Sequence, residues 1–432
     1  MDIDGYKSWA VESFDAERGF RPQMSHEAAV SETFTKDQGY ACLNLLHELL
    51  VVSDDNISGV LEAVKPILDT RLVKKEHVER VISCVKERKS SVPASLDALA
   101  YLATRIEGAA DMLRQMEFME IVVAYLGDVS CTGYLPGVFA LLFIALKAPE
   151  TATRPAFEAG LHECLLARLD REFAVESSSV LICMSRSVPP ESIRVFVEDL
   201  FIRLSEDDLQ PEVLANVLQC FHNVQATGYR IEKYLEEERL VENVTAFMGN
   251  KNPDVQVACL EVLSGLCAAG DRMLRTMISF GTICGARRAL ESDNSIVMKA
   301  ALGFFLAWTH HASEGYHLFD QISEMDFVHI CKNSTYETKR DMMNLIMTIT
   351  SKAEPVYITR LLSESFLDAF MEQTTCLCQE ACEQTFQILA QACSRSSADA
   401  AFIQRVNAVL SRAEFDSIEG AQMCRSIVAT LH

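Results

Sequence analysis

Apolar segments return along this chain at a nearly constant spacing of roughly 40 residues, and this feature constrains the fold more than any other. The positions that open the strongest apolar segments are Leu99, Leu141, Val180, Leu218, Leu260, Leu302, Asn344, Phe386 and Val428. A second apolar residue follows three positions after each, as on one face of a helix. Asn344 is the one polar member, and its neighbours Met343 and Leu345 indicate a one-residue slip. A unit this short cannot bury its own apolar face, so the spacing predicts stacked helical repeats that share a core.

Helix breakers separate the apolar segments. Prolines stand between them at Pro93, Pro136, Pro149, Pro189, Pro190, Pro211, Pro253 and Pro355. A proline inside a helix costs about 3 kcal/mol, so these positions mark helix starts and stops. Long alternating runs of β-branched and aromatic residues are absent from the sequence. The sequence therefore predicts an all-α protein.

The stretch 240–267 shows the layout of a single repeat. An apolar helix over 240–248 is followed by a polar turn at Asn252-Pro253-Asp254 and by a long helix from Val255. Together with the period, this layout resembles an armadillo repeat, a unit similar to the HEAT repeat. The resemblance implies a right-handed α-solenoid of about nine armadillo-like repeats of about 42 residues, which would occupy residues 91–432.

The repeat phase is lost before residue 90. We expect residues 39–90 to form an N-terminal helical cap or an atypical first repeat, and residues 1–38 to form a polar arm. The arm also contains a weak motif, made of Ser13-Phe14-Asp15-Ala16, Met24, Glu27-Ala28-Ala29-Val30, Phe34 and Gln38-Gly39. This motif resembles the opening of the armadillo repeat-containing protein 6 family.

Composition narrows the kinds of partner and compartment. Asp and Glu number 61 against 39 Lys and Arg, a formal charge of −22, so the chain repels a phosphate backbone and favours protein partners with basic or extended segments. The longest apolar run, Val138–Leu146, is far shorter than the roughly 20 residues of a membrane span. The first thirty residues contain no secretory core, and the 15 cysteines are expected to be reduced thiols. We expect a cytoplasmic location, with nucleus and cilium left open.

The armadillo resemblance implies a concave face built from the third helices, which holds an extended peptide or a partner helix. In nuclear-import adaptors a Trp, and an Asn four residues later, recur on that face. The Trp positions here hold Leu142, Gln219, Glu261, Gly303 and Gln387, and the Asn positions hold Leu146, Asn223, Gly265, Ala307 and Gln391. Only Asn223 matches, which disfavours an import adaptor.

A more general role for these positions is still open. The polar residues Gln219, Asn223, Glu261, Gln387 and Gln391 would offer hydrogen-bonding groups to a partner, and Gly265, Gly303 and Ala307 would leave room for it. The alternative is that these are solvated helix positions without a ligand. We also expect Trp308, one residue out of phase, to be buried.

A second candidate surface is basic. It comprises Lys74, Lys75, Arg80, Lys86, Arg88 and Lys89. This segment could dock an acidic tail, although such runs are more often solvated helix faces whose long stems cover apolar surface.

No phosphate loop, nucleophile elbow or dinucleotide motif is present, so we predict neither catalysis nor a cofactor. The densest thiol group, Cys376, Cys378 and Cys382, lacks the second pair of ligands that structural zinc requires. The sequence predicts a non-catalytic scaffold or adaptor. One alternative is a structural component of a large cytoskeletal or ciliary assembly, and another is a chaperone cofactor.

Overall fold

The structure is a computed structural model. It describes residues 36–51, 56–68, 70–87, 92–105, 109–128, 133–146, 153–206, 209–235, 237–312, 327–328, 330, 334–363, 365–369, 379–396, 399–411 and 419–430. The chain forms two compact units, Met1–Ala148 and Pro149–His432. The predicted borders after residues 38 and 90 stay predictions.

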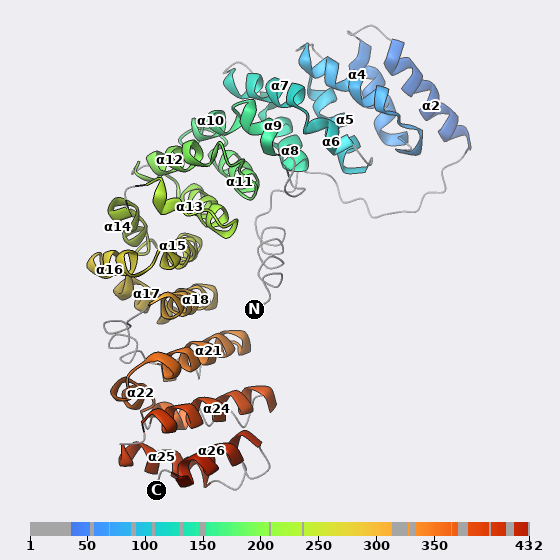
Figure 1. The fold of residues 1–432 in the computed structure, drawn as a ribbon. Helices are drawn as coiled ribbons and strands as arrows, with labels where there is room; N and C mark the ends of the chain where they lie inside the picture. The colour runs from blue at the N-terminus through green and yellow to red at the C-terminus, as the bar shows by residue number, and fades with distance from the viewer. Residues whose placement is uncertain are drawn as a thin grey trace. The chain divides into compact units, whose positions relative to one another are not determined.

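The first unit is built from helices of unequal length (Figure 1). They are α2 (Lys36–Val51), α3 (Ile57–Val64), α4 (Lys75–Lys86), α5 (Val92–Arg105), α6 (Ala109–Leu113), α7 (Met116–Gly127) and α8 (Leu135–Leu146), with short 3-10 turns at Lys65–Ile67 and Thr70–Leu72. The buried Tyr125 hydroxyl donates to the Val85 carbonyl at 2.8 Å, which joins α7 to the end of α4. Arg114 Nε donates to the Ala145 carbonyl at 2.9 Å and so caps the end of α8.

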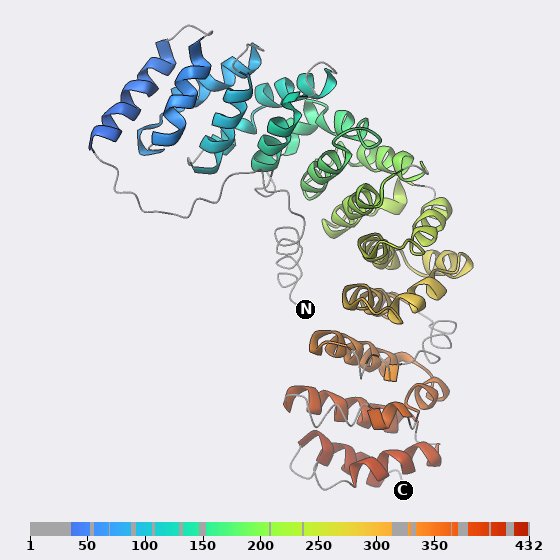
Figure 2. The same ribbon diagram turned by 180° about the vertical axis from the view of Figure 1, so that it is seen from behind.

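The second unit has two layers of helices, visible from both sides in Figures 1 and 2. One layer contains the last helix of each repeat, which we call the third helices: α11 (Ala174–Ser185), α13 (Pro211–Ala226), α15 (Pro253–Leu266), α18 (Ser295–His311), α21 (Tyr336–Lys352), α24 (Gln379–Arg395) and α26 (Glu419–Thr430). The other layer contains helices that are mostly shorter: α9 (Thr153–Glu158), α10 (Leu161–Leu166), α12 (Ile193–Leu204), α14 (Glu237–Phe247), α16 (Asp271–Ser279), α17 (Thr282–Leu290), α22 (Pro355–Leu361) and α25 (Ala400–Leu410). Each third helix packs on the next one along the chain.

Local sequence sets where the third helices begin. The Asn252 side chain accepts a hydrogen bond from the Asp254 backbone N–H at 2.8 Å, and Pro253 follows as the first helical residue of α15. Asn294 caps α18 in the same way, by accepting from the backbone of Ile296 at 2.9 Å. The helices α13, α15 and α18 therefore begin at evenly spaced positions, Pro211, Pro253 and Ser295.

The core contains the apolar residues that recur about every 40 positions in the sequence. Leu218, Leu260 and Leu302 are buried, as is Trp308, which confirms the prediction that Trp308 packs inside. Helix α21 starts one residue earlier than an even step from α18 would place it, so its register is shifted and Met343 takes the core position in place of Asn344. Every regular element among the described residues is a helix, so the all-α repeat prediction is confirmed.

Candidate protein-binding face

The eight residues predicted to line a binding face all lie on third helices of the second unit. They are Gln219 and Asn223 on α13, Glu261 and Gly265 on α15, Gly303 and Ala307 on α18, and Gln387 and Gln391 on α24. Gln387 is exposed and the other seven are half-buried, whereas most of the apolar residues beside them in the sequence, such as Leu218, Leu260 and Leu302, are buried. We call the surface that these eight residues share the third-helix face.

Two further residues belong to this face. Because the register of α21 is shifted by one, Asn344 and Thr348 occupy the places that Gly303 and Ala307 hold on α18, and both are half-buried. An unshifted register points instead to Leu345 and Ile349, which are buried. The polar residue at position 344 was the available signal, since it stands between two apolar ones.

The amides of α13 already have partners within the chain. Asn223 Nδ2 donates to Ser185 Oγ at 2.9 Å and, at 3.4 Å, to the carbonyl of Ile182, both on α11. Gln219 Nε2 lies 3.4 Å from Asn223 Oδ1. The two Asn223 contacts join neighbouring repeats, and the Gln219 contact lies within α13, so part of the predicted binding polarity is used inside the stack.

The seam between α13 and α15 is different, because it contains polar atoms that lack a partner. Within the described part of the chain, Glu261 Oε2, His222 Nδ1 and Gln225 Oε1 are buried and make no hydrogen bond. Burial raises the pKa of the Glu261 carboxyl, and the nearby His222 and a hydrogen bond from Gln219 offset this only in part. A buried acceptor without a donor is costly, so this seam is poorly satisfied in the chain alone.

The two glycines of the face differ in what surrounds them. A Cβ placed on Gly303 would have nothing within 4 Å, so the surface of α18 is open at this point. A Cβ on Gly265 would lie 2.5 Å from Gln225 Oε1, and the amide nitrogen of Gln225 donates to the Val262 carbonyl at 3.2 Å. Gly303 thus leaves room for something outside the chain, whereas the room at Gly265 is already filled by Gln225.

Cationic side chains hold the ends of two third helices. Lys352 Nζ donates to the carbonyls of Thr309 at 2.7 Å and His310 at 3.0 Å, at the end of α18. Arg395 Nη1 donates to the Thr350 carbonyl at 3.4 Å, at the end of α21. These carbonyls have no partner within their own helix, so the cations act as caps between repeats.

The predicted basic surface offers less positive charge than its sequence implies. Lys74 and Lys75 pair with Glu76 and Glu79 at 3.7 and 3.3 Å, and Lys86 forms an ion pair with Glu117. Arg80 lies half-buried on α4. Arg88 and Lys89 lie outside the described residues. Exposed pairs of this kind contribute little to stability, but they neutralise the cations that a partner would meet.

The described residues contain no group of three or more metal-ligating side chains, and Cys376 and Cys378 lie outside them. None of the described helices is both long and apolar enough to cross a membrane.

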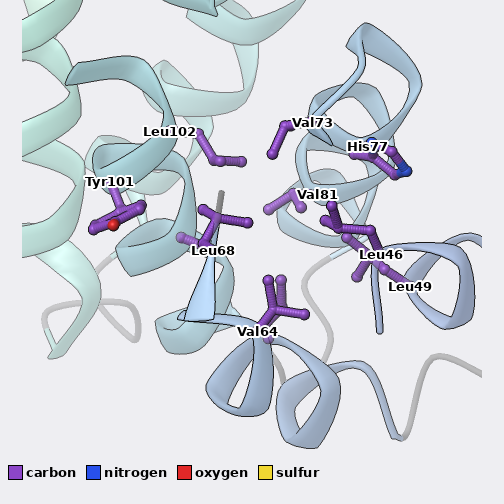
Figure 3. A pocket seen from close by; sticks show the side chains of 11 residues that line it. Leu46, Leu49, Val64, Leu68, Val73, His77, Val81, Tyr101 and Leu102 are labelled. Atoms are coloured by element: carbon purple, nitrogen blue, oxygen red, sulfur yellow. The ribbon is translucent and has the colours of Figure 1, made fainter. Parts of the chain in front are cut away.

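The first unit has an apolar cavity of about 20 Å³ between α2, α3, α4 and α5 (Figure 3). It is lined by Leu46, Leu49, Leu61, Val64, Leu68, Val73, His77, Val81, Ala98, Tyr101 and Leu102. A volume this small holds about one water molecule, so the cavity is a packing defect and cannot take a small-molecule ligand.

No protein-family model and no curated protein matches the chain, so the resemblance to the armadillo repeat-containing protein 6 family is not supported. Solved structures do match. An engineered protein from the Northeast Structural Genomics Consortium is similar to 90% of this chain and 99% of its own, with a TM-score of 0.65 and 17% identity. A designed armadillo repeat protein is similar to 54% of this chain and 99% of its own, with a TM-score of 0.46 and 16% identity.

The chain folds as an armadillo-like α-solenoid. The likeness to the engineered protein, at a TM-score of 0.65 and 17% identity, shows the fold alone.

Proposed function

We propose that this armadillo-like protein is a non-catalytic scaffold or adaptor, which binds an extended segment of a partner protein on its third-helix face. The observation that carries the proposal is the combination of unpartnered polar atoms at the α13–α15 seam with open surface at Gly303 on the next helix. A partner segment that crosses these helices could form hydrogen bonds with the unpartnered atoms and fill the open surface at Gly303. The repeat fold is consistent with such a role.

The arrangement of the polar groups supports binding over catalysis. The face presents amides on α13, α21 and α24 and one carboxyl on α15, and neighbouring helix axes in such a stack are about 8–10 Å apart. Catalytic groups must instead converge within about 3 Å of a reacting atom. A row of this kind fits repeated contacts to an extended chain.

Filling the open surface tests the proposal. We would compare the double variant Gly303→Gln/Ala307→Gln with the control Ala246→Gln, which adds the same side chain at an exposed position of α14 in the other layer. Proteins retained by each variant from native extract would be quantified by mass spectrometry. We expect the face variant to lose partners that the wild type and the control keep. Equal recovery by all three would contradict the proposal.

A second candidate function is a structural part of a larger assembly. Val195 and Ile202 lie two helical turns apart on α12, in the layer that does not contain the third helices, and are 47% and 59% exposed. Apolar side chains exposed on one helix face favour contact with another protein there. The variant Val195→Ser/Ile202→Ser should then shift the native complex to a smaller size in gel filtration of extract, and an unchanged elution would argue against this candidate.

A further inference from the structure

We infer that Glu261 anchors a basic side chain, lysine or arginine, of the partner segment at the seam between α13 and α15. The inference rests on the proposed function, and it names the chemistry that the third-helix face would recognise.

Glu261 lies where a partner can reach it. The residue is half-buried on α15, and α13 brings Gln219 and His222 beside its carboxyl. The enclosed oxygen is Oε2, which has no partner among the described residues. The last torsion of a glutamate side chain is soft, so the carboxyl can adjust to a donor that enters the seam.

No cation within the described chain pairs with Glu261. Other surface carboxylates do find one: Glu337 accepts from Lys299 Nζ at 2.8 Å, and Glu198 from Arg194 Nε at 2.8 Å. Among the described residues, the groups that favour the ionised form of Glu261, and so lower its pKa, are the His222 ring and the Gln219 amide. An enclosed carboxylate without a cation is destabilising, and a partner's cation would remove that cost.

The unpartnered atoms of the seam favour a ligand that carries hydrogen-bond donors. Besides Glu261 Oε2, the seam leaves Gln225 Oε1 and His222 Nδ1 without a partner among the described residues. The amide oxygen and an ionised carboxylate can only accept hydrogen bonds, and His222 Nδ1 accepts in one of its neutral tautomers. Lysine has three donors, arginine has five, and neither has an acceptor. Arginine can reach two acceptors at once because its donors form a planar fork.

The neighbouring helix gives such a segment room to approach. Gly303 holds on α18 the place that Glu261 holds on α15, one repeat later, and its surface is open. A backbone that lies against Gly303 can direct a long side chain back to Glu261. The net charge of −22 would favour the encounter.

Binding of defined peptides tests the inference. The probes are three short fluorescein-labelled peptides in which serine alternates with arginine, with citrulline or with glutamate. Citrulline has nearly the shape of arginine without its charge. Anisotropy would be measured on the wild type, on Glu261→Gln and on the control Glu242→Gln, at about 0.15 M salt to screen nonspecific attraction. Glu242 is exposed on α14, in the other layer. Its substitution replaces one glutamate with glutamine, as Glu261→Gln does.

We expect the wild type to bind the arginine peptide roughly tenfold more tightly than the citrulline peptide, as a charge-assisted contact provides. Glu261→Gln should lose about this factor, whereas Glu242→Gln should keep it. Arginine-peptide affinity that is equal in the wild type and Glu261→Gln would overturn the inference. A wild type that binds neither the arginine peptide nor the citrulline peptide would also overturn the inference, because that result is expected if only water occupies the seam.

Stability serves as the folding control for this variant. Glu261 has a higher pKa in the folded chain than in the unfolded chain, where it is about 4.5. The unfolded chain therefore loses this proton more readily, and the protein becomes less stable as the pH rises above about 4.5. Glu261→Gln should therefore unfold at a higher temperature than the wild type at neutral pH. If Glu261→Gln leaves peptide affinity unchanged while Gly303→Gln/Ala307→Gln still loses partners, the inference fails and the proposed function stands. If neither variant loses binding, both fail.

Discussion

Replacing Gly303 with alanine should make the protein more stable. Gly303 lies in the middle of α18 and has no positive φ angle. A glycine in a helix interior is less favourable than alanine by about 0.5–1 kcal/mol, because it loses more backbone freedom on folding. The new Cβ would have nothing within 4 Å, so no clash offsets the gain. We therefore expect Gly303→Ala to raise the free energy of unfolding by about 0.5–1 kcal/mol.

Gly265→Ala is the matched control, since the same change on α15 meets an obstacle. Its Cβ would lie 2.5 Å from Gln225 Oε1, so the amide must move and release the Val262 carbonyl. A lost hydrogen bond costs about 1 kcal/mol, which cancels the gain in helix propensity. Gly265→Ala should thus be close to neutral, and it should become stabilising in a Gln225→Ala background.

Both substitutions can be measured by urea unfolding followed by circular dichroism. Because repeat proteins can unfold in segments, amide hydrogen exchange over residues 295–311 should confirm that the change at Gly303 is local. A Gly303→Ala protein that is less stable than the wild type would refute the description of open surface on α18. Equal effects of Gly265→Ala with and without Gln225 would refute the assigned role of the Gln225 amide.

Three further predictions follow from packing, capping and burial. Leu263→Ala should lower stability by about 2–5 kcal/mol in denaturant unfolding, because Leu263 is fully buried. Lys352→Met should lower it by about 1 kcal/mol in the same assay, because two carbonyls at the end of α18 lose their donor. Burial lowers the pKa of His162, so the unfolded chain takes up a proton more readily and the melting temperature should fall as pH drops below about 6.5. The variant His162→Gln should reduce this pH dependence, and an unchanged profile would show that His162 does not cause it.

The architecture was predictable because stacking leaves a strong trace in the sequence. A helix that packs on both neighbours must bury residues such as Leu260 and Leu263 at three- to four-residue spacing, and each repeat must do so at the same place. Asn252 and Pro253 mark a helix start for local reasons that a sequence also shows. The sequence indicated a one-residue slip at Asn344. That the slip places Asn344 on the third-helix face became clear only from the residue at which α21 begins.

The state of the face was less predictable. Sequence spacing placed Gln219, Asn223 and Glu261 on one surface, but it could not tell which of them had partners inside the chain. Asn223 bonds to α11, whereas Glu261 Oε2 has no bond among the described residues. The sequence gives no reason to expect different surroundings for Gly265 and Gly303. The difference arises because the Gln225 side chain of the neighbouring helix fills the space at Gly265. Such differences depend on contacts between one repeat and the next, which the sequence within a single repeat does not show.

The central claim is that one layer of helices, the third-helix face, receives the partner. Site-specific photo-crosslinking tests it most directly, with benzoylphenylalanine placed at Gly303 in one variant and at the exposed Ala246 of the other layer in a second. After irradiation in native extract, adducts would be identified by mass spectrometry. We predict a discrete partner adduct from position 303 that is absent from position 246. The same set of adducts from both positions would contradict the claim and would favour a protein built into an assembly through both layers.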